Sequence, residues 1–294
     1  MTKTAFIAIV GRPNVGKSTL LNTICGEKIA IVSNKPQTTR NRITGILTKG
    51  ENQYVFLDTP GMHKPRTALG DFMVKTANGS IGEADATVLV VEPVPSVGDI
   101  EKGILERVKA SKSPCILVVN KVDEHTPAAI AETIAAYSAD YNFDAVVPLC
   151  AKNGKGIDAL FEEVDKFLYE SVWFFPEDAI TDQPERQIVA EVIREKLLRT
   201  LNKEIPHGTA VVIEEFKDEG KILRIRAEIF CERESHKGII VGKNGAALKL
   251  VGTYARQDLE AFFGTKVYLN LWVKVKENWR DSAANVSNFG YRDE

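Results

Sequence analysis

Residues 11–18 read GRPNVGKS and match GxxxxGK[ST], a pattern that folds as a loop between a buried strand and a helix. The apolar run FIAIV precedes it and the helix-forming TLLNTIC follows it. In such a loop, backbone N–H groups and the helix N-terminus surround a β-phosphate. Lys17 bridges the outer phosphates, and the Ser18 hydroxyl ligates Mg²⁺. The residues expected to contact the nucleotide are Gly11, Asn14, Val15, Gly16, Lys17, Ser18 and Thr19.

The first 170 residues alternate short apolar runs with longer mixed segments. Continuous apolar strands separated by helices are typical of a mostly parallel sheet covered on both faces. The chain is therefore expected to begin with an α/β domain, and residues 42–49 can add an edge strand. The expected strands are 5–10, 54–57, 87–91, 116–119 and 146–149.

A phosphate loop does not identify the base, because kinases and ATPases share it. NKVD at 120–123 follows the strand 116–119, at the end of the strand where parallel sheets bind ligands. The Asp123 carboxylate can accept hydrogen bonds from guanine N1–H and the 2-amino group. Adenine offers neither donor, so it would leave a buried carboxylate unpaired. Asn120 and Lys121 would brace this pocket, and the predicted ligand is GTP or GDP.

Two further segments supply groups for the metal and the γ-phosphate. DTPG at 58–61 ends a strand, so that Asp58 can reach Mg²⁺ through water and the Gly61 N–H can contact the γ-phosphate. Thr59 and Pro60 belong to the same contact. In PQTTRNR, at 36–42, Thr39 is the residue expected on the metal with Ser18 and Asp58. Loops 33–42 and 61–80 are expected to order only around a γ-phosphate and Mg²⁺, as switches do.

The pattern changes after residue 170. Residues 171–186 contain two prolines and no clear period, which indicates a linker. A helical stripe follows, then two alternating strands around the turn 217–220, a helical region, and a last alternating strand at 269–275. The expected organisation is a first domain at 1–170, a linker at 171–186, a second domain at 187–280, and a tail at 281–294 without periodic pattern.

The second domain is basic although the net charge of the chain is −2. Residues 186–280 hold 18 Lys and Arg against 13 Asp and Glu, and no acidic residue occurs from Ser235 to Gln257. This stretch contains GKNG at 242–245, between helical segments and after two strands. That order, α-β-β-α-α-β, is the arrangement of a type II KH domain, whose GxxG loop clamps single-stranded RNA.

The loop chemistry fits an RNA backbone. Gly242 and Gly245 permit close approach, and Lys243 supplies charge. The alternative is a plain helix-to-helix turn, since GSIG at 79–82 shows that GxxG arises without function. Strand edges at 224–231 could read bases. The residues expected to contact RNA are Lys237, Ile239, Ile240, Gly242, Lys243, Asn244, Gly245, Ala246 and Lys249.

GRPNVGKS, QTTR, DTPG, NKVD and the CAK at 150–152 resemble, in order and spacing, the translation-factor-related GTPases. With the basic second domain, the resemblance extends over essentially the whole chain to members that assist ribosome assembly. It implies a P-loop GTPase domain followed by a smaller α+β KH domain that binds ribosomal RNA near the 3′ end of the small-subunit RNA. It also implies that Cys150, Ala151 and Lys152 contact the guanine, with Cys150 replacing the serine of many members.

The resemblance further implies slow GTP hydrolysis, because Met62 follows DTPG and cannot orient a water molecule. Lys17, Asn14, Thr39 and Gly61 are the expected catalytic group. In related GTPases the equivalent of Asn14 ligates K⁺; the alternative is that Asn14 only stabilises its own turn.

The remaining expectations concern location and rival functions. No apolar run approaches the roughly 18 residues that would span a bilayer, and the four cysteines form no CxxC pair. The chain is expected to be a cytoplasmic monomer, although some members of the resembling family contact the inner membrane peripherally. The rival functions are a metabolic phosphotransferase and an RNA-binding protein with an inactive nucleotide site.

Overall fold

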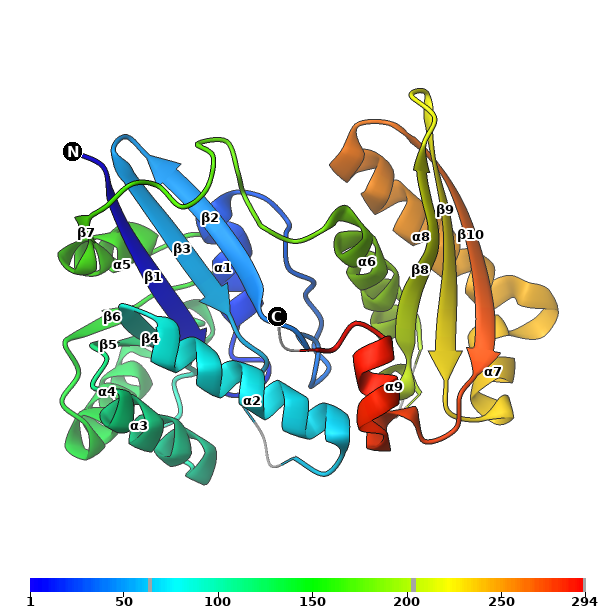
Figure 1. Ribbon diagram of the computed structural model, residues 1–294. Helices are drawn as coiled ribbons and strands as arrows, with labels where there is room; N and C mark the ends of the chain where they lie inside the picture. The colour runs from blue at the N-terminus through cyan, green and yellow to red at the C-terminus, as the bar shows by residue number, and fades with distance from the viewer. Residues whose placement is uncertain (63–64, 202–204, 293–294) are drawn as a thin grey trace. The chain divides into compact units, whose positions relative to one another are not determined.

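The computed structural model describes residues 1–62, 65–201 and 205–292. The chain divides into two compact units. The first comprises residues 1–65 and 70–182, and the second residues 66–69 and 183–294. Each unit has its own sheet and helices (Figure 1), and each is described by itself below.

The first unit is built on a sheet with the strand order β2-β3-β1-β4-β5-β6. All neighbours on this path are parallel except β2 and β3, which are antiparallel, and the short β7 pairs antiparallel with β1. The expected strands and the edge strand are thereby confirmed. The strands are β1 (Lys3–Val10), β2 (Ile43–Lys49), β3 (Asn52–Asp58), β4 (Ala86–Val91), β5 (Cys115–Val119), β6 (Ala145–Pro148) and β7 (Tyr169–Glu170).

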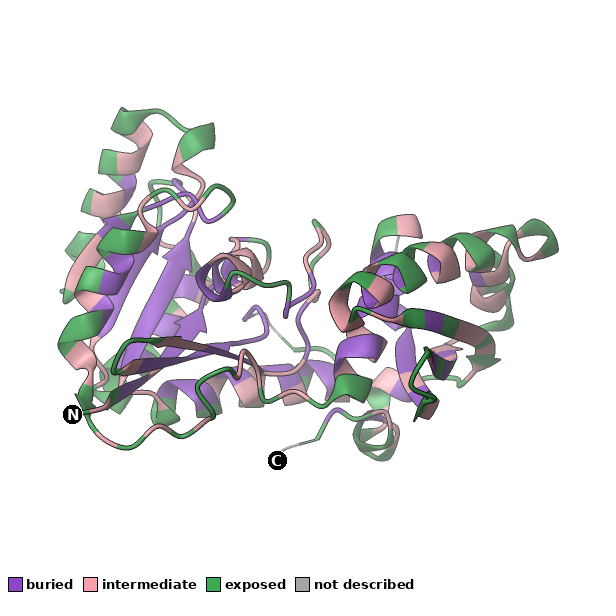
Figure 2. Cartoon of the chain, turned by 90° about the horizontal axis from the view of Figure 1, so that it is seen from above, coloured by how far each residue is buried: buried purple, intermediate pink, exposed green. Residues whose placement is uncertain are grey.

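Helices cover both faces of this sheet because its central strands are apolar on both sides. On one face Ile7 and Ile9 of β1 pack in a core with residues of two helices, and on the other Ala8 and Val10 pack with residues of three more. The first pair is α1 (Lys17–Cys25) and α5 (Ile157–Val164), and the second group is α2 (Ala68–Glu83), α3 (Asp99–Ser111) and α4 (Pro127–Asp140). Figure 2 shows the strands of this sheet as almost wholly buried.

The structure corrects the expectation of a loop over residues 61–80. Helix α2 begins at Ala68, so only the segment before it is irregular, and residues 63 and 64 lie outside the described part of the chain. Three glycines, Gly70, Gly79 and Gly82, lie within this helix and lower its intrinsic propensity. Packing of Ala77 and Ile81 against the sheet outweighs that cost.

Residues 171–182 form an extended strap along the first unit. The strap is held by Gln53 of β3, which is fully buried. Its side-chain oxygen accepts from the Phe174 and Phe175 N–H groups at 2.9 and 3.1 Å, and its nitrogen donates to the Phe175 carbonyl at 2.9 Å. The Ile46 N–H of β2 donates to the Ile180 carbonyl at 2.9 Å. The strap is therefore attached to the β2–β3 hairpin before the chain reaches the second unit.

The second unit has a three-stranded sheet with three helices packed on one face. The sheet order is β10-β9-β8, with β9 and β10 parallel and β8 antiparallel to β9. Alternate strand residues and one stripe of each helix form its core, which confirms the expected α-β-β-α-α-β order. The elements are α6 (Glu185–Thr200), β8 (Ala210–Asp218), β9 (Ile222–Cys231), α7 (Glu234–Val241), α8 (Ala246–Phe263) and β10 (Lys266–Val275).

The tail is ordered against the second unit through residue 292. Trp279, two residues before the tail, is fully buried, and its indole N–H donates to the Gly208 carbonyl at 2.9 Å. A short helix, α9 (Ala283–Asn288), follows. The Phe289 ring after it stacks on Phe230 of β9 with centroids 4.5 Å apart. The tail therefore covers one end of the sheet face that the three large helices leave open.

Candidate functional site

The phosphate-loop sequence forms a tight turn between β1 and α1. Its glycines are required by conformation and by close packing. Gly16 has φ 102°, and a Cβ there would lie 2.2 Å from Nδ2 of Asn120. Gly11 has φ 151°, and a Cβ there would lie 2.4 Å from the Val90 carbonyl oxygen. Only glycine fits either position, because the loop backbone packs closely against Asn120 and Val90.

Lys17 lies at the start of α1 with its ammonium group held inside the loop. Its Nζ donates to the Gly11 carbonyl at 3.1 Å and to the Arg12 carbonyl at 2.8 Å. Burial lowers the pKa of Lys17 to about 8, although the nearby Asp58 charge acts in the opposite direction. A buried cation that donates to two neutral carbonyls is arranged to receive an anion such as a phosphate.

Ser18, Thr39 and Asp58 converge beside Lys17. The Ser18 hydroxyl donates to Oδ2 of Asp58 at 2.6 Å and lies 2.8 Å from the Thr39 hydroxyl oxygen. Burial raises the pKa of Asp58 to about 6, opposed by the Lys17 charge and by the Ser18 hydrogen bond. Oδ1 of Asp58 is buried, and no described residue donates to it. Two hydroxyls and a carboxylate with an unused oxygen fit a hard cation such as Mg²⁺.

Asn120 joins the phosphate loop to the loop after β6. The side chain is buried, its Nδ2 donates to the Val15 carbonyl at 2.8 Å, and its Oδ1 accepts from the Ala151 N–H at 2.9 Å. Thr23 of α1 adds a second link, since its hydroxyl donates to the Ala151 carbonyl at 2.6 Å. Three motifs that are far apart in the sequence are therefore in direct contact.

Asp123 and Cys150 lie side by side at the other end of this site. A hydrogen bond from the Cys150 thiol lowers the pKa of Asp123. Cys150 is 1% exposed. Asp123 itself is exposed in this structure, which differs from the expected buried carboxylate, and the buried Cys150 lies beside it.

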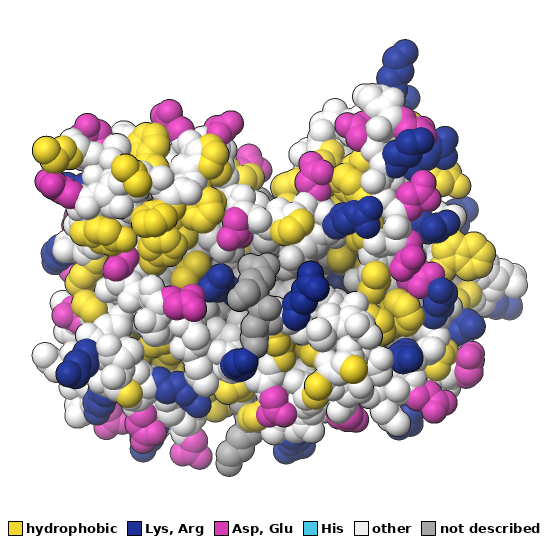
Figure 3. All heavy atoms as spheres, viewed as in Figure 1, with side chains coloured by type: hydrophobic (Ala, Val, Ile, Leu, Met, Phe, Trp, Pro, Cys, Tyr) yellow, Lys and Arg dark blue, Asp and Glu magenta, His cyan; other side chains and the backbone are white. Residues whose placement is uncertain are grey.

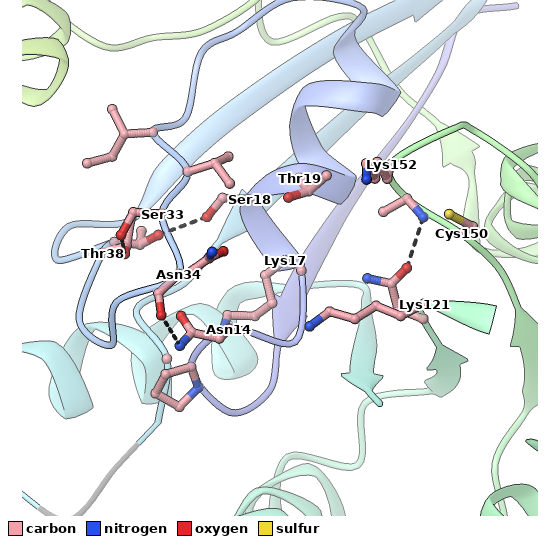
Figure 4. A pocket seen from close by; sticks show the side chains of 18 of the residues that line it. Asn14, Lys17, Ser18, Thr19, Ser33, Asn34, Thr38, Lys121, Cys150 and Lys152 are labelled. Carbon is pink, nitrogen blue, oxygen red and sulfur yellow. Dashed lines mark hydrogen bonds between the residues drawn. The ribbon is translucent and has the colours of Figure 1, made fainter. Parts of the chain in front are cut away.

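These groups surround a cavity of about 560 Å³ (Figure 4). Of the residues expected at the nucleotide or metal, the lining includes Asn14, Gly16, Lys17, Ser18, Thr19, Thr39, Gly61, Asn120, Lys121, Asp123, Cys150, Ala151 and Lys152. Gly11, Val15, Asp58, Thr59 and Pro60 are not part of the lining. The Val15 side chain packs in the core, and the Thr59 hydroxyl donates to the Ile9 carbonyl at 2.9 Å. Val15 can therefore contribute only backbone groups.

A charged cluster beside the cavity was not expected from the sequence. Glu92, directly after β4, pairs with Lys121 and lies 4.0 Å from the Arg12 guanidinium. Arg12 also pairs with Glu101 of α3, which is buried. The cluster ties a phosphate-loop residue to a residue of NKVD. The sequence feature that could have indicated this cluster is that Glu92 directly follows an apolar strand, at the ligand-binding edge of a parallel sheet.

Asn14 and Met62 also occupy defined positions. Asn14 has φ 67°, and its side-chain amide donates to the Asn34 carbonyl at 3.0 Å. It thus connects the phosphate loop to segment 33–42 (Figure 4). Met62 is buried in the apolar core that packs on α2, α3 and α4, and it is not among the residues that line the cavity.

In the second unit, GKNG forms the turn between α7 and α8. Gly242, Asn244 and Gly245 all have positive φ, at 73°, 52° and 76°. A Cβ on Gly242 would lie 2.8 Å from Cβ of Ala247, whereas one on Gly245 would have no atom within 4 Å. Lys243, Asn244 and Ala246 are exposed. The turn therefore presents open backbone and one lysine to solvent.

Ile240 corrects one expected RNA contact. The side chain is 0% exposed and belongs to the core of the second unit, whereas Ile239 is 51% exposed. Neighbours on a helix point in different directions, and α7 directs Ile240 inward. Ile240 therefore has no surface to offer to a base.

A groove between α8 and β10 continues from this turn. It has a volume of about 470 Å³ and is lined by Gly245, Leu248, Lys249, Gly252, Thr253, Arg256 and Val267–Leu271. No acidic residue is among them. The base reading predicted at 224–231 falls on β9, the central strand of the sheet, whereas the strand that borders the groove is β10. The alternating pattern predicts strands and not which strand is at the edge.

No helix in the described parts of the chain is long and apolar enough to cross a membrane.

Comparisons with known proteins identify both units. Residues 6–121 match a family model described as a 50S ribosome-binding GTPase, and residues 204–280 match the KH domain. The chain is 50% identical to the GTPase Era of Clostridioides difficile over 296 residues, covering all of both chains. It is 49% identical to the GTPase Era of Clostridium kluyveri, covering 99% of this chain and 100% of that one.

Two crystal structures are similar along the whole chain. One is of Era in complex with MgGDPNP and nucleotides 1506–1542 of 16S ribosomal RNA, with a TM-score of 0.96, 39% identity and full coverage of both chains. The other is of a point variant of Aquifex aeolicus Era bound to GDP.AlF4⁻, with a TM-score of 0.95 and 39% identity, covering 99% of this chain and 100% of that one. Fold, motifs and full-length identity agree, and the chain belongs to the Era family of GTPases.

Proposed function

We propose that this chain is a GTP-hydrolysing switch that binds small-subunit ribosomal RNA near its 3′ end and assists assembly of the small ribosomal subunit. The observation that carries the proposal is the cavity in which phosphate-loop, metal and base-reading residues meet. The second unit supplies a basic KH turn and groove. Its solved relative was crystallised with nucleotides 1506–1542 of 16S ribosomal RNA.

Residues 1–170 form the nucleotide domain in this proposal, residues 171–186 the linker and residues 187–280 the RNA-binding domain. Asp123, which lies beside Cys150, accepts from guanine N1–H and the 2-amino group. Lys17 and the loop N–H groups hold the phosphates, and the Gly61 N–H contacts the γ-phosphate. Ser18, Thr39 and Asp58 would hold Mg²⁺, which would supply positive charge to offset the charge that develops on the transferred phosphoryl group.

Hydrolysis is expected to be slow without an activator. Met62 has an apolar side chain that is buried in the core, and it therefore cannot orient the attacking water. A potassium ion at Asn14 would supply part of the missing positive charge. The proximity of the Asn14 amide to the Asn34 carbonyl, at 3.0 Å, supports this role, because rotating the amide would direct two oxygens at one cation.

The working form in this proposal is a cytoplasmic monomer whose partner is RNA, with at most peripheral contact with the inner membrane. The metabolic phosphotransferase is the rival. It predicts a second acceptor besides water, so phosphate release would fall short of GTP consumption.

The first prediction concerns base selectivity. The protein should bind GTP about 10⁴-fold more tightly than ATP, because ATP leaves the Asp123 carboxylate unpaired. Asp123→Ala should weaken GTP binding by about 10²-fold or more, as measured by titration calorimetry. Glu124→Ala removes the adjacent carboxylate on the same lining and should change affinity little. Equal affinity of Asp123→Ala and the unmodified protein for GTP would contradict the assignment.

The second prediction concerns potassium. At equal ionic strength, GTP hydrolysis should be about tenfold faster in KCl than in NaCl, because K⁺ adds charge beside the phosphates. Asn14→Gly keeps the positive φ and removes the amide, so it should abolish the difference between the two salts. Equal rates of the unmodified protein in KCl and NaCl would exclude a potassium role.

The third prediction concerns the KH turn. Crosslinking in cells followed by sequencing should recover the 3′ end of the small-subunit RNA. Gly245→Asp places a carboxylate where a phosphate would lie, without a clash, and aspartate tolerates positive φ. The variant should lose most of these crosslinks and keep its GTP affinity. An unchanged crosslink pattern would reject the turn as the RNA clamp.

A further inference from the structure

The outer face of the second unit's sheet carries two exposed aromatic side chains. Tyr268 and Trp272 of β10 are 51% and 58% exposed. They are four residues apart on one strand, so they point to the same face and lie about 13 Å apart. Helices α6, α7 and α8 pack on the opposite face through alternate residues such as Leu269 and Val273. Large apolar side chains grouped on one exposed face can mark an interaction site, whereas a single one needs no explanation.

The residues around them are suited to nucleic-acid bases. Arg224 of β9 lies opposite Tyr268, and its guanidinium carbon is 5.3 Å from the centre of that ring. Arg226 lies opposite Asn270, between the two aromatics. Aromatic rings and guanidinium planes are the groups on which unstacked bases stack. In Figure 3, basic and acidic side chains are interspersed with hydrophobic ones over the second unit.

Charge on this face increases toward the edge that borders the groove. On this face β8 carries Glu215 and Lys217, β9 carries Arg224 and Arg226 against Glu228, and β10 carries Lys266 and Lys274 and no acidic residue. The groove itself is lined by Lys249 and Arg256 and by no acidic residue. Acidic partners offset part of the charge on the sheet, because Arg224 pairs with Glu219, Arg226 with Glu215 and Lys274 with Glu228. The basic groove residues remain suited to attract a polyanion to this edge.

Tyr268 also connects the two surfaces. It is among the residues that line the groove, and its ring is exposed on the outer face. The opposite end of this face is covered, because Phe289 stacks on Phe230. A strand that leaves the groove therefore reaches Tyr268 first and Trp272 next.

We propose that single-stranded RNA held at GKNG continues over the β10 edge and stacks its bases on Tyr268 and Trp272. The inference rests on the proposed RNA-binding function and adds a second, sequence-tolerant part to the same interface. Its consequence is that the binding site is longer than the roughly four nucleotides that a KH loop clamps.

The test uses the full chain and nested single-stranded fragments of the 3′ end of 16S rRNA, labelled with fluorescein. Anisotropy titration measures affinity as the fragment lengthens. Trp272→Ala should weaken binding of the longer fragments by about tenfold, since base–aromatic stacking has that order of effect. It should leave the shortest bound fragment unaffected. Trp272→Phe should restore most of the loss, and the longer fragments should quench tryptophan fluorescence in the unmodified protein.

The controls separate this inference from the proposed function. Tyr254→Ala removes an aromatic of similar exposure on α8 that does not line the groove, and it should bind all fragments normally. Thermal unfolding and GTP hydrolysis of Trp272→Ala should be unchanged, because the side chain is exposed. If Gly245→Asp abolishes binding while Trp272→Ala binds every fragment normally, the sheet platform is wrong and the KH clamp stands.

Other outcomes also decide the question. If Gly245→Asp binds every fragment normally, the KH clamp itself fails. If Trp272→Ala instead dissociates a dimer in sedimentation, the face serves a second copy of the chain and the RNA platform is overturned.

Discussion

The side-chain amide of Asn120 holds the nucleotide site together. One atom of the amide donates to the phosphate loop and the other accepts from the loop after β6, and both hydrogen bonds are buried. Loss of either partner would leave a buried polar group unpaired, at a cost of about 1–3 kcal/mol. The contact also explains Gly16, because any Cβ there would collide with the same amide. The phosphate loop and the loop after β6 are therefore joined through one side chain.

Local patterns were sufficient to predict most of the first unit. The strand, glycine loop and helix around Lys17 follow from spacing and apolar runs, and so does the convergence of Ser18 and Asp58 at one sheet edge. The Glu92 cluster could not be predicted in the same way, because ion pairs depend on which loops meet after folding. Segment 61–80 was expected to be a loop because it follows DTPG, where a switch would lie, whereas packing of Ala77 and Ile81 against the sheet supports a helix from Ala68 onward.

The second unit shows the same limit at single residues. Ile239 and Ile240 are adjacent and have identical side chains, and only the orientation of α7 buries Ile240 and exposes Ile239. The alternating pattern predicted β9 and β10 equally well, but the sheet order makes β10 the strand beside the groove. Which strand meets a ligand is a property of topology, which neither strand's sequence contains.

In the proposed function, the strap at 171–182 would link the nucleotide state to RNA binding. Segment 33–42 contains Thr39 and leads directly into β2, and Ile46 of β2 binds the strap that leads into α6. If the metal and γ-phosphate reorder segment 33–42, the β2–β3 hairpin and the strap attached to it would move as well. The decisive measurement is the affinity of the full chain for the 3′ end of 16S rRNA with a GTP analogue and with GDP. The account predicts that RNA affinity differs between the two nucleotide states. It also predicts that RNA changes the relative affinity for the GTP analogue and GDP by the same factor. Identical RNA affinity in the two nucleotide states would contradict it.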